Sequence, residues 1–192
     1  MHYRADSINI TKSIEGLSNG FIVHSTDTLN SLSADATSDS HIQRVIDFKQ
    51  RKGPFSIIVN SIKDIHKYAK VNTAQLDIIN QVLPGVFTVL LEAKKSNLSK
   101  LATEGSSLIG IRVPHHKFTS DLIKEFKKPI ITTSLNKTGE APISNLKKVA
   151  KIYPDILIFD DEKERRSKGS TILDISSDEI KIVRHGDGEY KL

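Results

Sequence analysis

Cysteine is absent from the 192-residue sequence, and no apolar run is long enough to cross a bilayer. The lack of cysteine excludes disulfide bonds, thiol nucleophiles and cysteine-ligated metal centres, and it fits a reducing compartment. The first residues also lack the hydrophobic core of a signal peptide. From these absences we expect a cytoplasmic protein with no membrane partner.

The common signatures of phosphate and metal sites are missing as well. No G-x-x-x-x-G-K-S/T segment occurs, and no G-x-G-x-x-G follows an expected strand, so a glycine-rich phosphate loop is not expected. Neither H-x-x-x-H nor H-E-x-x-H occurs, and the adjacent His115 and His116 point in opposite directions on an extended chain. We therefore expect no metal ion held by protein side chains.

The charge balance is basic, with a net charge of +5 and a pI near 9.3. A positive field favours anionic partners such as nucleotides or RNA. Aromatic residues make up only 6% of the chain, which argues against a stacking platform for single-stranded RNA. Because no linker-like segment interrupts the sequence, we expect a single domain over residues 1–192.

Short β-branched runs interleave with amphipathic helices, which predicts an α/β fold of six or seven strands. Residues 170–175 and 179–185 are expected to pair as a hairpin. Residues 160–169 are rich in charge and poor in apolar side chains, which predicts an exposed loop. The expected helices cover 7–20, 38–49, 61–69, 73–83 and 119–127, and residues 142–144 lead into a further helix that contains Leu146, Val149 and Ile152. The main strands are expected at 21–23, 55–59, 86–93, 108–114, 129–134 and 156–159.

Residues 129–139 are the most informative stretch, because an apolar run leads into hydroxyls, an amide, a lysine and a glycine. That order is typical of a buried strand ending in a polar loop, where ligands bind in open α/β sheets. Ser134 and Asn136 are two residues apart and so share a face, as do Thr26 and Thr28. Such groups can bind phosphate or carboxylate oxygens. The alternative is that they only form turns and caps.

Three cations, Lys49, Arg51 and Lys52, lie at or just after the end of the helix expected at 38–49. By spacing alone they suit a solvated helix end, but Lys49 and Arg51 could instead reach an anion site beside the next strand. Arg112 lies within an otherwise apolar strand, where a charge needs a partner or a ligand. Its place near the strand end favours a ligand.

Seven segments between residues 21 and 186 occur in the order of the motifs of one family. The chain resembles the YrdC family of threonylcarbamoyl-adenylate synthases. Ser-Thr-Asp-Thr at 25–28 resembles the family's Pro-Thr-Asp/Glu-Thr, and Lys-Gln-Arg at 49–51 resembles its Lys-x-Arg. The segments at 83–88 and 111–114 resemble its Pro-Gly-Pro-x-Thr and Arg-Val-Pro. Those at 133–139, 169–174 and 183–186 resemble its Ser-x-Asn-x-Ser-Gly, Pro-Ser-Thr-Ile/Val-x-Asp and Arg-x-Gly.

The resemblance implies a twisted mixed sheet flanked by helices, with a basic concave cleft. It implies that L-threonine, bicarbonate and ATP react to give threonylcarbamoyl-adenylate and pyrophosphate. The product is used to modify adenosine in tRNA, so a downstream tRNA-modifying transferase, or RNA itself, is an expected partner. Mg²⁺ is expected to bind through the ATP phosphates rather than through protein ligands. The alternative is a YrdC-like protein that binds RNA or a nucleotide without synthase turnover.

The resemblance also implies roles for individual residues. Lys49 and Arg51 are the expected catalytic residues. The residues expected to bind the nucleotide are Lys49, Arg51, Ser134, Asn136 and Arg184. Those expected to bind threonine are Thr26, Arg112, Thr132 and Ser170, with Arg112 taking the carboxylate.

Two segments depart from the family pattern. After Thr28 the family usually has Val-Tyr-Gly-Leu, whereas this chain has Leu-Asn-Ser-Leu at 29–32. After Arg51 the family usually has a longer loop, whereas only Lys52 and Gly53 precede Pro54 here. The first change concerns threonine selection, and the second concerns the surroundings of the nucleotide.

Overall fold

The computed structural model describes residues 1–136, 139–163 and 166–191. Lys137 and Thr138 of the informative stretch, and Glu164 and Arg165 of the charged run, lie outside the described residues. Among the described residues, no helix is both long and apolar enough to span a membrane.

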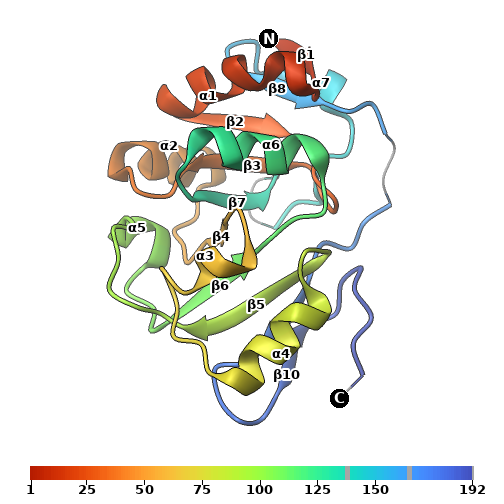
Figure 1. Cartoon of the computed structure of the whole chain (residues 1–192). Helices are drawn as coiled ribbons and strands as arrows, with labels where there is room; N and C mark the ends of the chain where they lie inside the picture. Colours follow the sequence, from red (N-terminus) through yellow and green to blue (C-terminus); the bar gives the residue numbers. More distant parts are fainter. Residues whose placement is uncertain (137–138, 164–165, 192) are drawn as a thin grey trace.

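Ten strands of the described chain form one mixed sheet in the order β1-β8-β2-β3-β7-β4-β6-β5-β9-β10 (Figure 1). The pairs β1–β8, β8–β2, β4–β6 and β5–β9 are parallel, and the other neighbours are antiparallel. The strands are β1 (His2–Arg4), β2 (Phe21–His24), β3 (Ser31–Asp35), β4 (Ser56–Ile58), β5 (Phe87–Glu92), β6 (Leu108–Arg112), β7 (Ile130–Ser134), β8 (Ile158–Asp160), β9 (Thr171–Asp174) and β10 (Lys181–Arg184).

Helices cover both faces of this sheet, because their apolar stripes must be buried. One short 3-10 turn, Ser7–Asn9, precedes the first helix. The helices are α1 (Ile10–Ser18), α2 (Asp39–Lys49), α3 (Ile62–Ile65), α4 (Thr73–Val82), α5 (Lys100–Thr103), α6 (Lys117–Phe126) and α7 (Leu146–Ile152).

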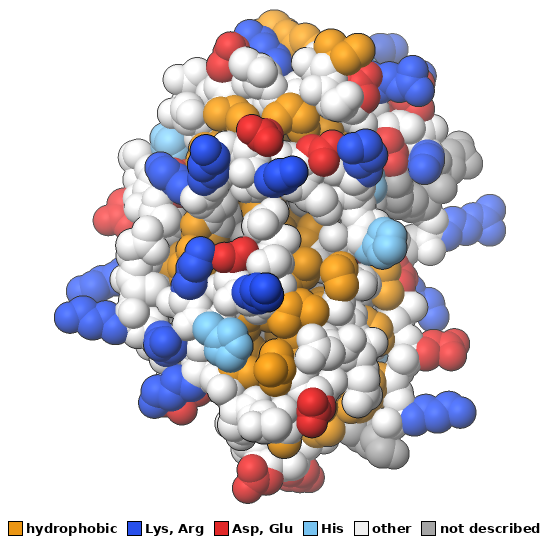
Figure 2. Space-filling model, in the orientation of Figure 1, with side chains coloured by type: hydrophobic (Ala, Val, Ile, Leu, Met, Phe, Trp, Pro, Cys, Tyr) orange, Lys and Arg blue, Asp and Glu red, His pale blue; other side chains and the backbone are white. Residues whose placement is uncertain are grey.

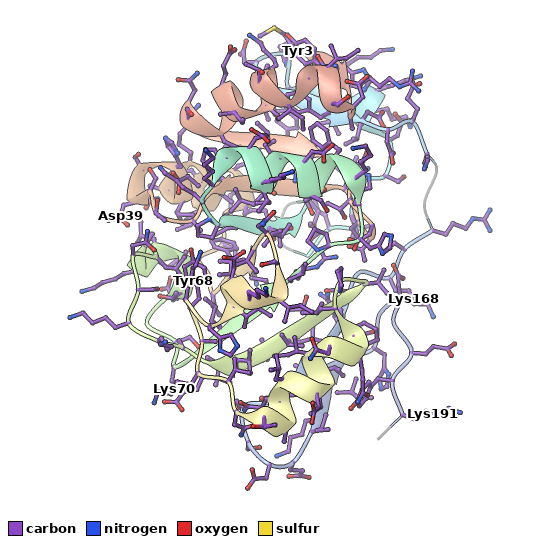
Figure 3. All side chains as sticks on the ribbon, viewed as in Figure 1. Tyr3, Asp39, Tyr68, Lys70, Lys168 and Lys191 are labelled. Carbon is purple, nitrogen blue, oxygen red and sulfur yellow. The ribbon has the colours of Figure 1, made fainter. Side chains whose placement is uncertain are left out.

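On one face, α1 and α6 lie side by side over the upper strands, as Figure 1 shows. Ile22, Ile58 and Ile130 project from that face and pack with Leu17 and Leu122 of the two helices. At the top edge, Tyr3 of β1 stacks on Phe159 with ring centroids 5.6 Å apart, and Figure 3 labels it there. This smaller apolar cluster covers only part of the face.

The opposite face carries the larger core. Alternate strand residues, among them Leu32, Ile57, Ile111 and Ile131, are fully buried there, and residues of α2, α4 and α7 pack against them. Burying such side chains contributes about 1.5–3 kcal/mol each, so this face supplies much of the stability of the fold.

The described residues form ten strands, more than the six or seven expected, and β1 and β3 correspond to none of the expected segments. β3 lies in the middle of the sheet between β2 and β7, and all five of its residues are buried. Its sequence, Ser-Leu-Ser-Ala-Asp, is too polar to be recognised as a central strand, because its hydroxyls are satisfied by neighbours rather than by water.

The starts of α3 and α4 are capped differently. Ser61, the N-cap of α3, donates its hydroxyl to the Asp64 carboxylate at 2.8 Å and does not form a capping box. A capping box forms at α4, where Asn72 is the N-cap and Gln75 is its partner. The predicted hairpin is confirmed by the antiparallel pairing of β9 with β10.

Candidate active site

A cavity of about 410 Å³ opens beside the strands that α1 and α6 leave uncovered. Its strand residues share one face of the sheet, as the pairing register shows. Ser31 faces Ser134, Ser56 faces Thr132, and Ile58 faces Arg112 across neighbouring strands. Because side chains alternate along a strand, the face that is apolar beneath the helices becomes polar here.

Lys49 ends α2 and is only 3% exposed. Its Nζ donates to the Ser134 carbonyl at 2.7 Å and to Asn136 Oδ1 at 2.9 Å. Ser134 Oγ also donates to Asn136 Oδ1, at 2.6 Å. Burial, and then the nearby charge of Arg51, lowers the Lys49 pKa from 10.5 to about 8. Lys49 is thus a desolvated cation held against the end of β7.

Arg51 follows α2 just beyond its left-handed C-cap, Gln50. Its guanidinium lies 5.8 Å from the centre of the Phe55 ring, and both residues line the cavity. This cation–π contact orients a side chain that is otherwise exposed. The two cations of the Lys-Gln-Arg segment therefore reach the same cavity, rather than both being solvated as spacing alone favours.

Arg112 ends β6 and is 5% exposed. Its Nη2 donates to Asp27 Oδ1 at 2.7 Å, and Asp27 Oδ2 accepts the His115 backbone N–H at 2.9 Å. Burial lowers the Arg112 pKa from its usual value, while the Asp27 charge opposes that shift. The buried charge of Arg112 is therefore paired with Asp27. Arg112 also lines the cavity, where it could contact a ligand.

Arg184 of β10 forms the opposite wall with Ser170. Its Nε and Nη2 donate to the Ser170 carbonyl at 3.0 and 2.7 Å, and Nη2 also contacts Ser170 Oγ at 3.0 Å. Ser170 Oγ lies 2.7 Å from Thr88 Oγ1. Burial, and then the Arg112 charge, lowers the Arg184 pKa, while Asp187 opposes the shift.

The chain after β10 packs directly on this wall, and glycine is required for the contact. A Cβ on Gly186 would lie 2.2 Å from the Gly169 carbonyl oxygen. Thr171 Oγ1 accepts the N–H groups of Gly186 and Gly188 and donates to the Gly188 carbonyl. These bonds hold the Ser170 segment in place.

A chain of hydroxyls lines the cavity floor. Thr132 Oγ1 donates to Ser31 Oγ at 3.0 Å, and Ser31 Oγ donates onward to the Leu29 carbonyl at 3.4 Å. Thr26 Oγ1 donates to the same carbonyl at 2.7 Å. With its proton directed to Ser31, Thr132 presents acceptor lone pairs rather than a donor to a ligand.

Eight of the nine predicted site residues line the cavity. They are Lys49, Arg51, Arg112, Thr132, Ser134, Asn136, Ser170 and Arg184. The exception is Thr26, which is fully buried and lies behind the wall. Its hydroxyl is used by the loop itself, since it also accepts the Thr28 backbone N–H at 3.1 Å. Thr26 thus shapes the loop that carries Thr28 and Leu29.

The prediction of site residues missed Ser31, Ser56 and Thr88, which also line the cavity. Ser56 and Thr88 interrupt otherwise apolar strands, and that interruption was the available signal. Ser31 gave no such signal because β3 was not recognised as a strand. Leu29 and Ser31, from the segment that departs from the family pattern, both reach the cavity wall.

The residues that line the cavity do not form a typical metal site. No group of three or more potential acidic or histidine ligands occurs within the described ranges. The residues lining the large cavity are cations, hydroxyls, amides and apolar groups. Such a lining suits an anion, and it suits a divalent ion only when that ion arrives with phosphates.

A second cavity, of about 210 Å³, lies at the other end of β4 and β7. It is lined by Val59, Asn60, Asp64, Lys67, Tyr68, Ile123, Lys124, Lys127, Lys128 and Pro129. Figure 3 labels Tyr68 beside α3. On the face drawn in Figure 2, basic side chains are interspersed with acidic ones.

Comparison with known proteins gives a consistent result. The family model named Sua5/YciO/YrdC, described as "Telomere recombination", matches residues 17–186. A putative threonylcarbamoyl-AMP synthase of Methanocaldococcus jannaschii is 34% identical over 181 residues, covering 90% of this chain and 82% of the relative. The threonylcarbamoyl-AMP synthase of Homo sapiens is 27% identical over 171 residues, covering 84% of this chain and 61% of the relative. This chain thus spans about three fifths of the human protein.

Solved structures share the fold. Sua5 of P. abyssi, in a crystal structure with L-threonine, superposes with a TM-score of 0.85 at 22% identity, covering 97% of this chain and 56% of that one. YciO of E. coli superposes with a TM-score of 0.85 at 21% identity, covering 98% of this chain and 95% of that one.

Proposed function

Since the chain belongs to the Sua5/YciO/YrdC family, we propose that it is a threonylcarbamoyl-AMP synthase. The reaction combines L-threonine, bicarbonate and ATP into threonylcarbamoyl-adenylate and pyrophosphate, for the threonylcarbamoyl modification of adenosine in tRNA. Support comes from two relatives named for this activity, one of them more than 30% identical to this chain.

The single observation that carries the proposal is the convergence of four cations in one cavity. Lys49, Arg51, Arg112 and Arg184 come from the end of α2, from β6 and from β10, yet they line the same space. ATP and bicarbonate are anions, and threonine carries a negative carboxylate. Cations preorganised by burial stabilise such charge more strongly than cations in water.

The chemistry needs positioning more than a protein nucleophile. The threonine amine takes up the bicarbonate carbon to form a carbamate, with loss of water. A carbamate oxygen then attacks the α-phosphorus of ATP, and the bond to the β-phosphate oxygen breaks to release pyrophosphate. Adenylyl transfer of this kind depends on alignment and charge neutralisation. A site of lysine, arginine, hydroxyls and an amide supplies both.

The proposed roles are those that the family resemblance implies, and the location of eight of the nine residues in one cavity supports them. Lys49, Arg51, Ser134, Asn136 and Arg184 are proposed to hold the nucleotide phosphates and the bicarbonate-derived group. Arg112, Thr132 and Ser170 are proposed to hold threonine. Arg112 takes the carboxylate, and the acceptor lone pairs of Thr132 suit a donor group of the amino acid. Thr26 contributes indirectly, by shaping the loop.

Mg²⁺ is proposed as the companion of the ATP phosphates. The cavity lining contains no carboxylate, so phosphate oxygens and water would form its ligands. When bound, the ion would neutralise part of the negative charge of the ATP phosphates. The protein residues around it orient the phosphates and exclude water.

A pyrophosphate-release assay with purified protein tests the proposal. Pyrophosphate should form only when ATP, L-threonine and bicarbonate are all present, and the adenylate should be detectable by mass spectrometry. Equal pyrophosphate release without threonine would exclude this activity. Binding of ATP without any product would instead identify a nucleotide-binding relative that does not turn over.

A further inference from the structure

Asp27 lies in the loop between β2 and β3, and it was not among the predicted site residues. One carboxylate oxygen accepts Arg112 Nη2 at 2.7 Å, across 85 residues of sequence. The other accepts the His115 backbone N–H at 2.9 Å. A single carboxylate thus holds both the side chain that ends β6 and the backbone that follows it.

Stability does not explain this pair well. The two side chains are each 6% exposed, so both charges have lost most of their water. Replacing a buried ion pair by apolar groups is often neutral or stabilising, because the desolvation cost offsets the attraction. A buried pair in a cavity wall therefore calls for another role.

The arginine still has donors to spare. Within the described residues, Asp27 is the only hydrogen-bond acceptor for the Arg112 side chain, and Arg112 Nε has no partner. A guanidinium offers several N–H donors in a rigid plane. Because Asp27 occupies one of them, it sets the direction in which the others point.

We infer that Asp27 is a positioning residue that orients the Arg112 guanidinium toward the carboxylate of the amino-acid substrate. The inference rests on the proposed function for the identity of that substrate. Asp27 also balances charge, since Arg112 and Arg184 are like charges and no acidic side chain lines the cavity within the described chain. Asp27 itself does not contact the reacting atoms.

Asp27→Asn is the decisive variant, because an amide has one acceptor oxygen where a carboxylate has two. Asparagine can satisfy Arg112 or the His115 N–H, but not both. A crystal structure of the variant should show the Arg112 guanidinium turned away from its present direction. An unmoved guanidinium would overturn the inference, and this result is obtained with or without turnover.

Kinetics provide the second readout. Asp27→Asn should raise KM for L-threonine about tenfold, as expected for a lost charge-assisted hydrogen bond, while KM for ATP changes less than about twofold. Asp27→Glu, which keeps both oxygens, should restore most of the threonine KM and serves if the asparagine variant folds poorly. Unchanged KM values in a folded Asp27→Asn protein would argue against positioning.

Asp35 offers a matched control. Its carboxylate is similarly buried and also holds a cation and a backbone N–H, with Lys128 Nζ at 2.7 Å and the Thr37 N–H at 2.8 Å. It does not line the large cavity. Asp35→Asn should lower thermal stability without changing KM for threonine. The same KM increase in both variants would indicate a general structural effect and overturn the inference.

The two proposals fail differently. If the wild-type protein shows no threonine-dependent pyrophosphate release, the proposed function is wrong, and the Asp27→Asn crystal structure still decides the orientation of Arg112. If wild-type turnover is present but Arg112 does not move in the variant, the synthase assignment holds and the role of Asp27 is wrong.

Discussion

The large cavity and the small cavity at the other end of β4 and β7 are both basic, yet their cations are held differently. In the large cavity, Lys49 and Arg112 are 3% and 5% exposed, and partners from other elements fix them. In the small cavity, the Lys67 and Lys128 side chains are 67% and 53% exposed. Both cavities are therefore lined by positive charge, and the burial of Lys49 and Arg112 distinguishes the large cavity.

Local effects account for three of the four lysines that line the small cavity. Lys67 pairs with Asp64 one turn away. Lys128 pairs with Asp35, 93 residues away, but its side chain is 53% exposed. Lys124 lies in the last turn of α6 and Lys127 is its C-cap, where a helix dipole favours cations. No comparable local effect explains Lys49, whose partners lie 85 and 87 residues away. A buried cation with long-range partners distinguishes the large cavity from the small one.

The largest expected effect separates the two cavities directly. Replacing Lys49 and Arg51 together by alanine should reduce pyrophosphate release by on the order of a hundredfold or more, because preorganised charge is lost at the phosphates. Replacing Lys124 and Lys127 together should change it less than about twofold, because exposed cations contribute little. Equal losses in the two double variants would contradict the comparison. Thermal melts of both proteins check that each is folded.

Arg112→Lys should have the next largest effect. Lysine keeps the charge beside Asp27 but loses the planar fork, so kcat/KM for threonine should fall about tenfold or more. Lys128→Ala, the matched change at the small cavity, removes a largely exposed partner of Asp35 and should cost less than about 1 kcal/mol of stability. Steady-state kinetics with threonine as the varied substrate measure the first effect, and chemical unfolding measures the second. A normal threonine kcat/KM in Arg112→Lys would exclude a bidentate contact.

The lowered Lys49 pKa predicts a specific pH dependence. The ammonium form, which binds phosphate, is lost as pH rises through about 8, so kcat/KM for ATP should decline above that pH. The free energy of unfolding should increase with pH, although kcat/KM decreases. The unfolded chain holds more protons between pH 8 and 10.5, so the free energy of unfolding rises with pH across that window. Lys49→Arg should remove the decline in kcat/KM, and a flat wild-type profile from about pH 7 to 9.5 would contradict the role of this proton.

The smallest effect concerns selection of the amino acid. Ser31→Ala removes the acceptor of the Thr132 hydroxyl proton, which then becomes available to substrate. The ratio of kcat/KM for threonine to that for serine should change by about fivefold, since a modest hydrogen-bond rearrangement is worth about 1 kcal/mol. Ser33→Ala is the control, because Ser33 Oγ contacts His24 Nε2 at 2.9 Å instead of facing the cavity. Identical ratios in wild type and Ser31→Ala would show that the altered segment does not affect selection.

The sequence predicted correctly those helices and strands that are specified by short stretches of the chain. The β-branched run of β7, the amphipathic α2 and the β9–β10 hairpin are confirmed because periodicity and turn residues specify them. β3 was missed because its serines look solvent-exposed in sequence, whereas across the sheet they meet Thr132 and His24. In the folded protein these serines form hydrogen bonds with side chains of neighbouring strands, whereas the sequence pattern suggested hydrogen bonds with water.

In the candidate site, too, some features follow from the local sequence and others from tertiary contacts. That Ser134 and Asn136 share a face follows from their spacing, and their side chains do meet. Thr26 has the same spacing from Thr28, yet its hydroxyl is used within the loop. Spacing predicts which side chains can face the same site. It does not predict whether their hydrogen-bonding groups are already bonded to other parts of the protein.

The sequence by itself determined the kinds of groups available, their order along the chain and the period that places them on one face of a strand. Only the tertiary structure decided that Lys49 is buried, that Asp27 holds Arg112 and that Thr26 lies behind the cavity wall. The physical reason is that burial and charge pairing depend on neighbours tens of residues away. Those neighbours are set by the packing of the whole sheet and its helices, which no local pattern contains.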